Sequence, residues 1–255
     1  MTAVLLLLAL LGAWEAYARL GDIDVFLLPA PTQVAEALWE DRSLLASDLA
    51  VTAVEVGLGL LLAIALGVGC AVVVHLVPAL GRAVQPLLVA SQTIPIVIIA
   101  PLLVAWFGFD LAPKVVIVAL VSFFPIAVTT LDGLRSVDPA LRRLLRTLDA
   151  RRCQVLLRVE APQALPAALS GTRIAVAVAV IGAVLAEQAG SEEGLGHLIL
   201  QAIPALDTPR AYAAVVVLSA FAIALYALLA LAERALVPWA RASTAPPSHR
   251  EDPTP

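Results

Sequence analysis

The chain has 255 residues, of which 61% are hydrophobic and 14% are charged, and its formal net charge is −4. Soluble domains are roughly 45–50% apolar and about 25% charged, so this composition excludes an ordinary soluble enzyme or nucleic-acid-binding domain and indicates a polytopic membrane protein. The two cysteines, Cys70 and Cys153, fit no metal spacing, and we expect neither a disulfide nor a metal site.

Six apolar runs are long enough to be membrane spans, because a helix needs ~20 mostly apolar residues to cross ~30 Å of hydrocarbon. They lie at 2–18, 51–77, 85–107, 112–132, 169–189 and 211–232. These runs and their short loops leave no room for a soluble catalytic domain. We therefore predict an all-α membrane protein, with six transmembrane helices in a single domain over residues 1–241. The remainder, residues 242–255, has the composition of a disordered cytoplasmic tail.

The first apolar run has an alternative interpretation as a signal peptide, since Ala16, Tyr17 and Ala18 resemble an A-x-A cleavage site. No basic region precedes the run, however, and Trp14 and Glu15 interrupt its end. We therefore retain it as the first helix.

A short interfacial helix is expected after the first span, in the stretch FLLPAPTQVAEALWE. Thr32 can cap this helix, and Val34, Ala37 and Leu38 then share one face. The second span contains Glu55 and four glycines, which predict close packing against a neighbouring helix because small residues let helices approach. These glycines are Gly57, Gly59, Gly67 and Gly69.

The third span is interrupted by three prolines, Pro86, Pro95 and Pro101. A helix in lipid tolerates proline only where protein or water satisfies the freed carbonyl groups. Gln92 and Thr93 precede the kink expected at Pro95, and polar side chains at membrane depth line a cavity or bond to another helix. Both interpretations stay open for this pair.

Basic residues set the predicted topology. Seven arginines lie between residues 133 and 168, and the positive-inside rule places this segment in the cytoplasm. Threading six spans from it puts both termini in the cytoplasm.

The same segment contains an apolar stripe with helical spacing, formed by Leu141, Leu144, Leu145 and Leu148. Val155, Leu156 and Val159 repeat part of this spacing after the polar stretch 149–152, so we predict two short helices that meet at a turn. A cytoplasmic stripe of this kind needs a covering surface, either lipid headgroups or another protein.

The segment resembles the "EAA" loop of permease subunits from bacterial ATP-binding-cassette importers. That pattern is E-A-A, three residues, Gly, nine residues, Ile, one residue and Leu-Pro. The corresponding positions here are Arg143, Leu144, Leu145, Asp149, Val159, Ala161 and Pro162. The spacing matches, whereas Arg143 and Asp149 depart from the pattern. Asp tolerates left-handed turn geometry better than most residues, although less well than Gly.

Further stretches are similar, in order, to permeases for nitrate, sulfonate, taurine and thiamine precursors. They include SQTIPIVIIAPLLVAWFGF, PKVVIVALVSFFPIAVTTLDGLRSVDPAL and the AEQAG...GLG stretch at 186–196. The resemblance implies a type I importer bundle in the bacterial inner membrane, built from two copies of the chain. Its implied partners are a cytoplasmic ATPase subunit and an extracytoplasmic binding protein. Its implied solute is hydroxymethylpyrimidine or a related thiamine precursor, with sulfonate, taurine or nitrate next.

The resemblance also implies a division of roles along the chain. The loop 134–168 couples to the ATPase, and its implied coupling residues are Arg143, Leu144, Leu145, Leu148, Asp149, Ala150, Arg151, Arg152, Val159 and Pro162. No P-loop is visible, since the single lysine, Lys114, follows Ala-Pro, and we expect ATP to bind only to the partner.

For the translocation path we select Gln92, Thr93, Pro95 and Glu187. An acid in a membrane segment is a functional candidate by default, although Glu187 also lies where it can contact the adjacent GLG loop. The alternative function is a secondary transporter driven by an ion gradient. Such proteins place ionisable residues or broken helices at mid-membrane in two related repeats, and neither an inverted repeat nor a central carboxylate is evident here.

Overall fold

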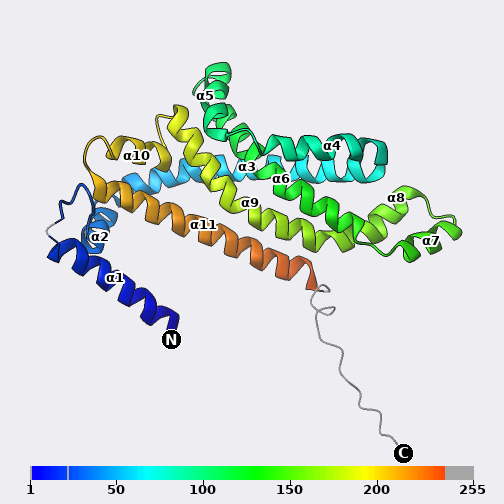
Figure 1. Ribbon diagram of the computed structural model, residues 1–255, viewed down its shortest axis with the longest axis horizontal. Coiled ribbons are helices and arrows are strands. Elements are labelled where there is room, and N and C mark those ends of the chain that lie inside the picture. The colour runs from blue at the N-terminus through cyan, green and yellow to red at the C-terminus, as the bar shows by residue number, and fades with distance from the viewer. Residues whose placement is uncertain (1, 22, 239–255) are drawn as a thin grey trace, which may run out of the picture.

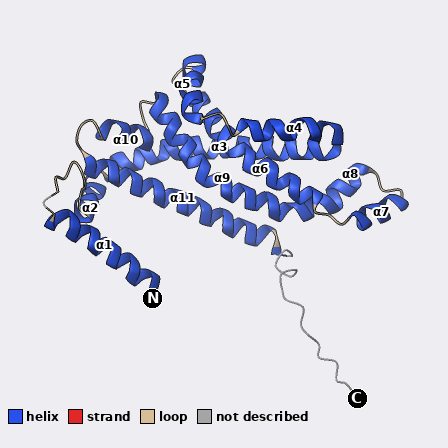
Figure 2. Cartoon of the chain, viewed as in Figure 1, coloured by secondary structure: helices blue, strands red, loops and turns tan. Residues whose placement is uncertain are grey.

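The computed structural model describes residues 2–21 and 23–238, and within them the chain forms only helices and loops (Figure 1, Figure 2). The helices are α1 Thr2–Leu20, α2 Pro31–Glu40, α3 Arg42–Leu76, α4 Pro78–Ser91, α5 Ile96–Phe107, α6 Leu111–Arg135, α7 Pro139–Thr147, α8 Arg152–Val155, the π-helix η1 Leu156–Glu160, α9 Ala161–Gly190, α10 Leu195–Ala202 and α11 Thr208–Leu236. The tail predicted at 242–255 lies outside the described residues.

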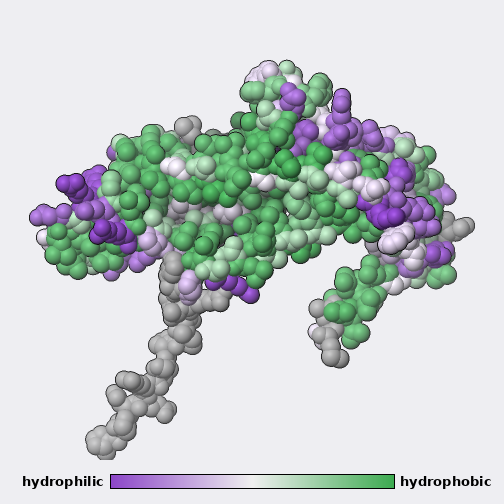
Figure 3. Space-filling model, turned by 180° about the vertical axis from the view of Figure 1, so that it is seen from behind, coloured by the Kyte–Doolittle hydropathy of each residue, from purple (hydrophilic) through white to green (hydrophobic). Residues whose placement is uncertain are grey.

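Four helical runs are long and apolar enough to cross a membrane. These are α3, α6, the continuous run 152–190 formed by α8, η1 and α9, and α11. Hydrophobic side chains cover the middle of the molecule, whereas hydrophilic ones gather towards its two ends (Figure 3). The prediction of an all-helical membrane protein is therefore confirmed. The count of six spans stays a prediction.

The core of the bundle is formed by α6, which packs against α3 on one side and α9 on the other. Glycine permits the first contact, because a Cβ atom at Gly59 would overlap Val118, and one at Gly67 would lie 2.9 Å from Ile126 Cγ2. The predicted close packing is confirmed for these two glycines. It is wrong for the other two, Gly57 and Gly69, since a Cβ at either would meet no atom within 4 Å.

The third predicted span, 85–107, is wrong as a single kinked helix, because the structure breaks it into α4 and α5. Pro95 lies at the N-cap of α5 in an extended conformation, with φ −65° and ψ 119°. Proline lacks an amide donor, and it disfavours helical geometry in the residue before it. The twelve residues of α5 span about 18 Å, which is less than the hydrocarbon thickness. Figure 1 shows α5 projecting sideways from the bundle.

The short helix expected near the first loop is present as α2, and its predicted apolar face is correct. Val34 and Ala37 are buried, and Leu38 is partly buried against the same cluster. The predicted cap is wrong, because α2 begins two residues earlier than a Thr32 cap allows, with Ala30 as N-cap and Pro31 at the first position. The Thr32 hydroxyl instead donates a hydrogen bond of 2.9 Å to the Glu15 carboxylate of α1.

The basic segment forms one short helix, α7, where the sequence predicts two. The second predicted helix is not separate, because α8 and η1 continue directly into α9. Pro162 does not end this run, although it lies inside it, directly after the π-helix η1. The coupling-type segment is thus one free helix joined by a turn to a long membrane helix.

Candidate functional site

Helix α7 presents an exposed apolar stripe at one end of the molecule. Asp138 caps the helix by accepting a hydrogen bond of 2.7 Å from the Ala140 amide, and Pro139 occupies the first turn. Leu144 is 56% exposed and Leu148 is 70% exposed, whereas Leu145 is only partly exposed. Side chains of this size, once fully buried, each contribute ~1.5–3 kcal/mol. The stripe therefore has a strong tendency to bind an apolar surface.

The turn after α7 is a Schellman motif with Asp149 in the left-handed conformation, at φ 55°. The Ala150 amide donates to the Leu145 carbonyl over 3.1 Å, and the Asp149 amide donates to the Arg146 carbonyl over 3.1 Å. Both bonds satisfy carbonyl groups that the helix end would leave unpaired. The geometry that the resemblance assigns to glycine at this position is thus adopted by aspartate.

The remaining residues selected for this loop fall into two groups. Arg143, Arg151 and Arg152 are exposed around α7 and its turn, together with the partly exposed Ala150. Val159 and Pro162 lie further along, in η1 and the first turn of α9, and both are partly buried. The structure therefore gathers the residues up to Arg152 on one free surface and places the last two on the helix that enters the bundle.

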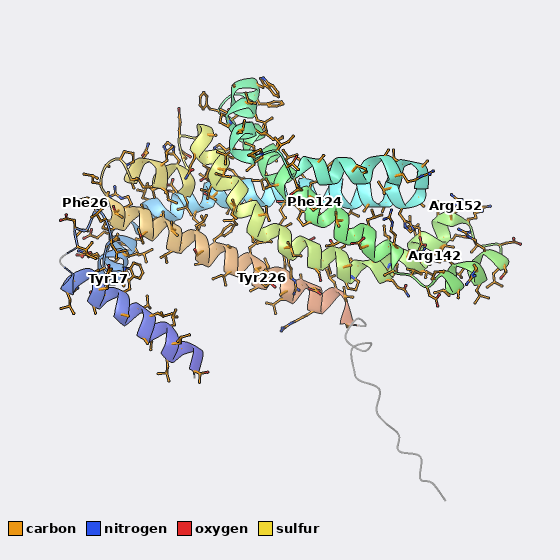
Figure 4. The ribbon with its side chains drawn as sticks, viewed as in Figure 1. Tyr17, Phe26, Phe124, Arg142, Arg152 and Tyr226 are labelled. Carbon is orange, nitrogen blue, oxygen red and sulfur yellow. The ribbon has the colours of Figure 1, made fainter. Side chains whose placement is uncertain are left out.

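A buried carboxylate ties this loop to the bundle. The Glu160 carboxylate of η1 forms an ion pair with Arg142, 2.8 Å from its Nε, and lies 2.8 Å from His75 Nε2 near the end of α3. Arg142 also donates through Nη2 to the Leu134 carbonyl of α6 over 2.6 Å. Figure 4 labels Arg142 near α7, with Arg152 at the same end of the molecule. Glu160 thus joins α7, η1 and α3 at one point, and no part of the sequence pattern singled it out.

Two of the selected path residues line one cavity. Gln92 and Pro95, from the break between α4 and α5, border a cavity of about 220 Å³ whose other side is formed by α6 and α9 through Leu120, Val121 and Val178. Thr93 closes the turn instead, since its hydroxyl donates to the Ala90 carbonyl over 2.8 Å. The break therefore exposes polar groups beside the two core helices.

Glu187, the fourth path residue, does not line this cavity and is fully buried elsewhere. Its carboxylate accepts a hydrogen bond of 2.6 Å from the Thr52 hydroxyl of α3 and another from the Gly196 amide. The Thr52 hydroxyl in turn accepts from the Leu195 amide over 3.0 Å. Glu187 therefore contacts the GLG loop. This is the alternative to a role in the translocation path that the sequence left open.

An ion pair lies beside this carboxylate. Lys114 of α6 is 2.8 Å from Glu55 of α3, and their side chains are 8% and 0% exposed. Lys114 also donates to the Ser191 hydroxyl over 2.6 Å, in the loop before α10. The three ionisable groups occur near the ends of three different apolar runs. An ionisable residue in an apolar run is a functional candidate, but the sequence does not predict that these three lie close together.

A second ion pair that sequence reasoning missed joins α9 to α11. Arg173 lies 3.1 Å from Glu233, and its guanidinium carbon lies 5.4 Å from the centroid of the Tyr226 ring. Figure 4 labels Tyr226 on α11. An arginine inside an apolar run is the signal that could have found it. For a metal, by contrast, the described residues contain no cluster of three His, Cys, Asp or Glu side chains.

Comparison with known proteins adds a family match. The model of the family described as "binding-protein-dependent transport system inner membrane component" matches residues 59–242. This range contains α6, the basic loop and α11, together with the cavity at 92–95.

Curated relatives cover nearly the whole chain. The formylaminopyrimidine transport permease protein of Halalkalibacterium halodurans is 38% identical, over 92% of this chain and 94% of its own. The riboflavin transport system permease protein of Chloroflexus aurantiacus is also 38% identical, over 91% and 88%. The taurine transport system permease protein of Escherichia coli is 32% identical, over 91% and 87%.

Proposed function

We propose that two copies of this chain, which belongs to the family of binding-protein-dependent transport inner membrane components, form the translocation path of an ATP-binding-cassette importer. The chain is a multi-pass inner membrane permease component for a small solute and is not itself the ATPase. Family membership implies two kinds of partner, an ATPase subunit and a binding protein. Residues 1–241 form a single permease domain in this proposal.

The exposed stripe of α7 carries the assignment of the coupling surface. Leu144 and Leu148 are large apolar side chains left exposed on a helix that is too short to enter a membrane. We assign them to a groove on the ATPase subunit, where burial supplies the binding energy. Arg143 and Arg151 are exposed beside the stripe and suit acidic groups at the rim of that groove.

Glu160 then provides the mechanical link between the ATPase and the bundle. When ATP binding draws the two ATPase subunits together, α7 moves with them. Because Glu160 holds Arg142 of α7 and His75 of α3 through contacts of 2.8 Å each, displacement of α7 is passed to the membrane helices. The exchange of inward-facing and outward-facing states is a rigid-body movement of this kind.

The opposite end of the molecule, with α2, α10 and the loop 191–194, receives the binding protein in this proposal. Both chain termini then lie in the cytoplasm, as the positive-inside rule predicts. The path follows the break at Gln92 and Pro95, where a helix interruption beside α6 and α9 frees polar groups for solute.

For the solute we favour a pyrimidine-type thiamine precursor. The relative named for formylaminopyrimidine transport is 38% identical, the relative named for taurine 32%, and the relative named for aliphatic sulfonates, from Bacillus subtilis, 29%. The riboflavin permease, at 38%, carries another heteroaromatic solute by its name. A small aromatic solute also suits a cavity lined mainly by Ile94, Ile96, Ile99 and Leu120. Sulfonate, taurine or nitrate comes next.

The test is purification of the tagged chain in gentle detergent, followed by mass spectrometry of the proteins retained. Leu144 and Leu148 are changed to Asp together, and Leu145 is left intact because its partial burial supports the fold. We expect an ATPase subunit to be retained by the native chain and lost from the L144D/L148D variant.

A control is Thr147→Asp, which adds one of the two negative charges that L144D/L148D introduces, at an exposed position of α7 outside the stripe. Retention of the ATPase by this control assigns the loss to the stripe. If the native chain retains no ATPase, α7 lies on the membrane surface and the secondary transporter becomes the better account.

A further inference from the structure

A second basic feature at the cytoplasmic end is separate from the α7 stripe. A cleft of about 240 Å³ lies between the end of α3, α7 and the run from α8 to η1. Its lining includes His75, Arg142, Arg146, Arg152, Val155 and Glu160. Elements distant in the sequence thus direct basic groups towards one space.

The charges of this cleft are not balanced internally. Glu160 is its single acid, and it is already engaged by His75 and Arg142. Among the ion pairs of residues 2–21 and 23–238, none involves Arg146 or Arg152. Two guanidinium groups therefore remain for an anion, and their planar donors suit the oxygens of a phosphate.

The cleft lies at the end of a membrane-length helix. His75 is the penultimate residue of α3, whose 35 residues exceed the ~20 that cross the hydrocarbon, so the end of α3 can reach the headgroup region. Apolar side chains close to the lining in sequence are exposed, with Val73 at 48%, Val77 at 47% and Leu157 at 69%. A basic cleft bordered by exposed apolar side chains suits a molecule with an anionic head and acyl chains.

We propose that this cleft binds the phosphate of an anionic lipid headgroup, held by Arg146 and Arg152. Basic pockets between membrane helices on the cytoplasmic side bind such headgroups, and the cytoplasmic leaflet is anionic. The inference rests on the proposed function for its side of the membrane. The lipid and the ATPase use different surfaces, since the headgroup enters behind α7 while Leu144 and Leu148 face outwards.

The experiment follows thermal unfolding of the detergent-purified chain with added phosphatidylglycerol, phosphatidylcholine or inorganic phosphate. A ligand that binds only the folded state stabilises it by RT ln(1 + [L]/Kd), so the Tm rises with ligand concentration above Kd. We expect phosphatidylglycerol to raise the Tm, and the two other additives to leave it unchanged. In Arg146→Gln the concentration that gives the same rise in Tm should be about tenfold higher, equivalent to about 1.4 kcal/mol.

Two further variants make the test specific. Arg152→Gln should reproduce the loss, which guards against a folding defect peculiar to Arg146→Gln. Arg158→Gln removes an exposed arginine of η1 that does not line the cleft, and should respond as the native chain does.

Three outcomes would overturn the proposal. They are an equal response to both lipids, an equal loss in Arg158→Gln, or saturation by inorganic phosphate alone. The ATPase pull-down reports independently on the proposed function. If the native chain responds to the lipid but retains no ATPase, only the coupling assignment is contradicted. If the native chain retains the ATPase but does not respond to the lipid, only the lipid site is contradicted.

Discussion

The charged side chains at the two ends of the bundle differ in burial and in pairing. At the end near α10, Glu55, Lys114 and Glu187 are buried. Lys114 pairs with Glu55 and donates to Ser191, and Glu187 accepts a hydrogen bond from Thr52. At the other end, the arginines around α7 are exposed and the ion pairs do not use most of them. One end satisfies its charges internally, and the other leaves them for other molecules.

The charges near α10 therefore act on the stability of the fold, whereas those near α7 are available to bind other molecules. A buried ion pair is strongly destabilising to break because one partner remains unpaired, whereas an exposed arginine contributes ~0–1 kcal/mol to the fold. We therefore expect substitutions near α10 to act on stability and substitutions near α7 to act on binding. Four substitutions test this difference between the two ends.

The largest effect is expected for Lys114→Met. It leaves Glu55 buried without its cation, which costs about 3–5 kcal/mol. Thermal unfolding in detergent should show a much lower Tm. The double variant with Glu55→Leu removes both charges and should recover most of the loss. A native-like Tm of the single variant would mean that the ion pair does not stabilise the fold.

Next is Glu160→Gln, which removes the charge shared by Arg142 and His75. Weakening a buried charged hydrogen bond costs about 1.5–3 kcal/mol. We expect solute-dependent ATP hydrolysis to fall while the ATPase subunit is still retained, because the α7 stripe is intact. Glu193→Gln, an exposed acid near α10, is the control. Full coupling in Glu160→Gln would contradict the link from α7 to α3.

Gly196→Ala should have an intermediate effect. The new Cβ would lie 2.7 Å from Glu187 Oε2 and 2.8 Å from the Val184 carbonyl, so the loop must move. Overpacking of this kind costs about 1–3 kcal/mol. Gly57→Ala is the matched control, since no atom lies within 4 Å of its Cβ. Equal Tm values for the two variants would show that the GLG loop is not tightly held.

The smallest effect is expected for Asp149→Gly. Glycine removes the left-handed penalty of roughly 1–2 kcal/mol, and its own chain entropy offsets part of that gain. Coupled ATP hydrolysis should stay the same or rise, and the Tm should rise slightly. Loss of hydrolysis would reveal a specific contact made by the Asp149 carboxylate.

The sequence predicts those features that depend on local composition. Apolar length identifies the long helices, and helical spacing identifies the stripe at Leu144 and Leu148. It cannot predict the break at 92–95, because a proline kinks or ends a helix according to the tertiary partners available for the freed carbonyls. For the same reason Glu55, Lys114 and Glu187 read as three separate anomalies, since only packing of α3, α6 and α9 brings them together.

Uptake by reconstituted vesicles distinguishes an ATP-driven importer from a secondary transporter. The chain is reconstituted with its ATPase subunit and binding protein, and uptake of a labelled pyrimidine is followed with ATP on the ATPase side and ion gradients dissipated by ionophores. We predict uptake that requires ATP and the binding protein and that the L144D/L148D variant abolishes. Uptake that proceeds without ATP and stops with the ionophores would contradict the importer account and establish a secondary transporter.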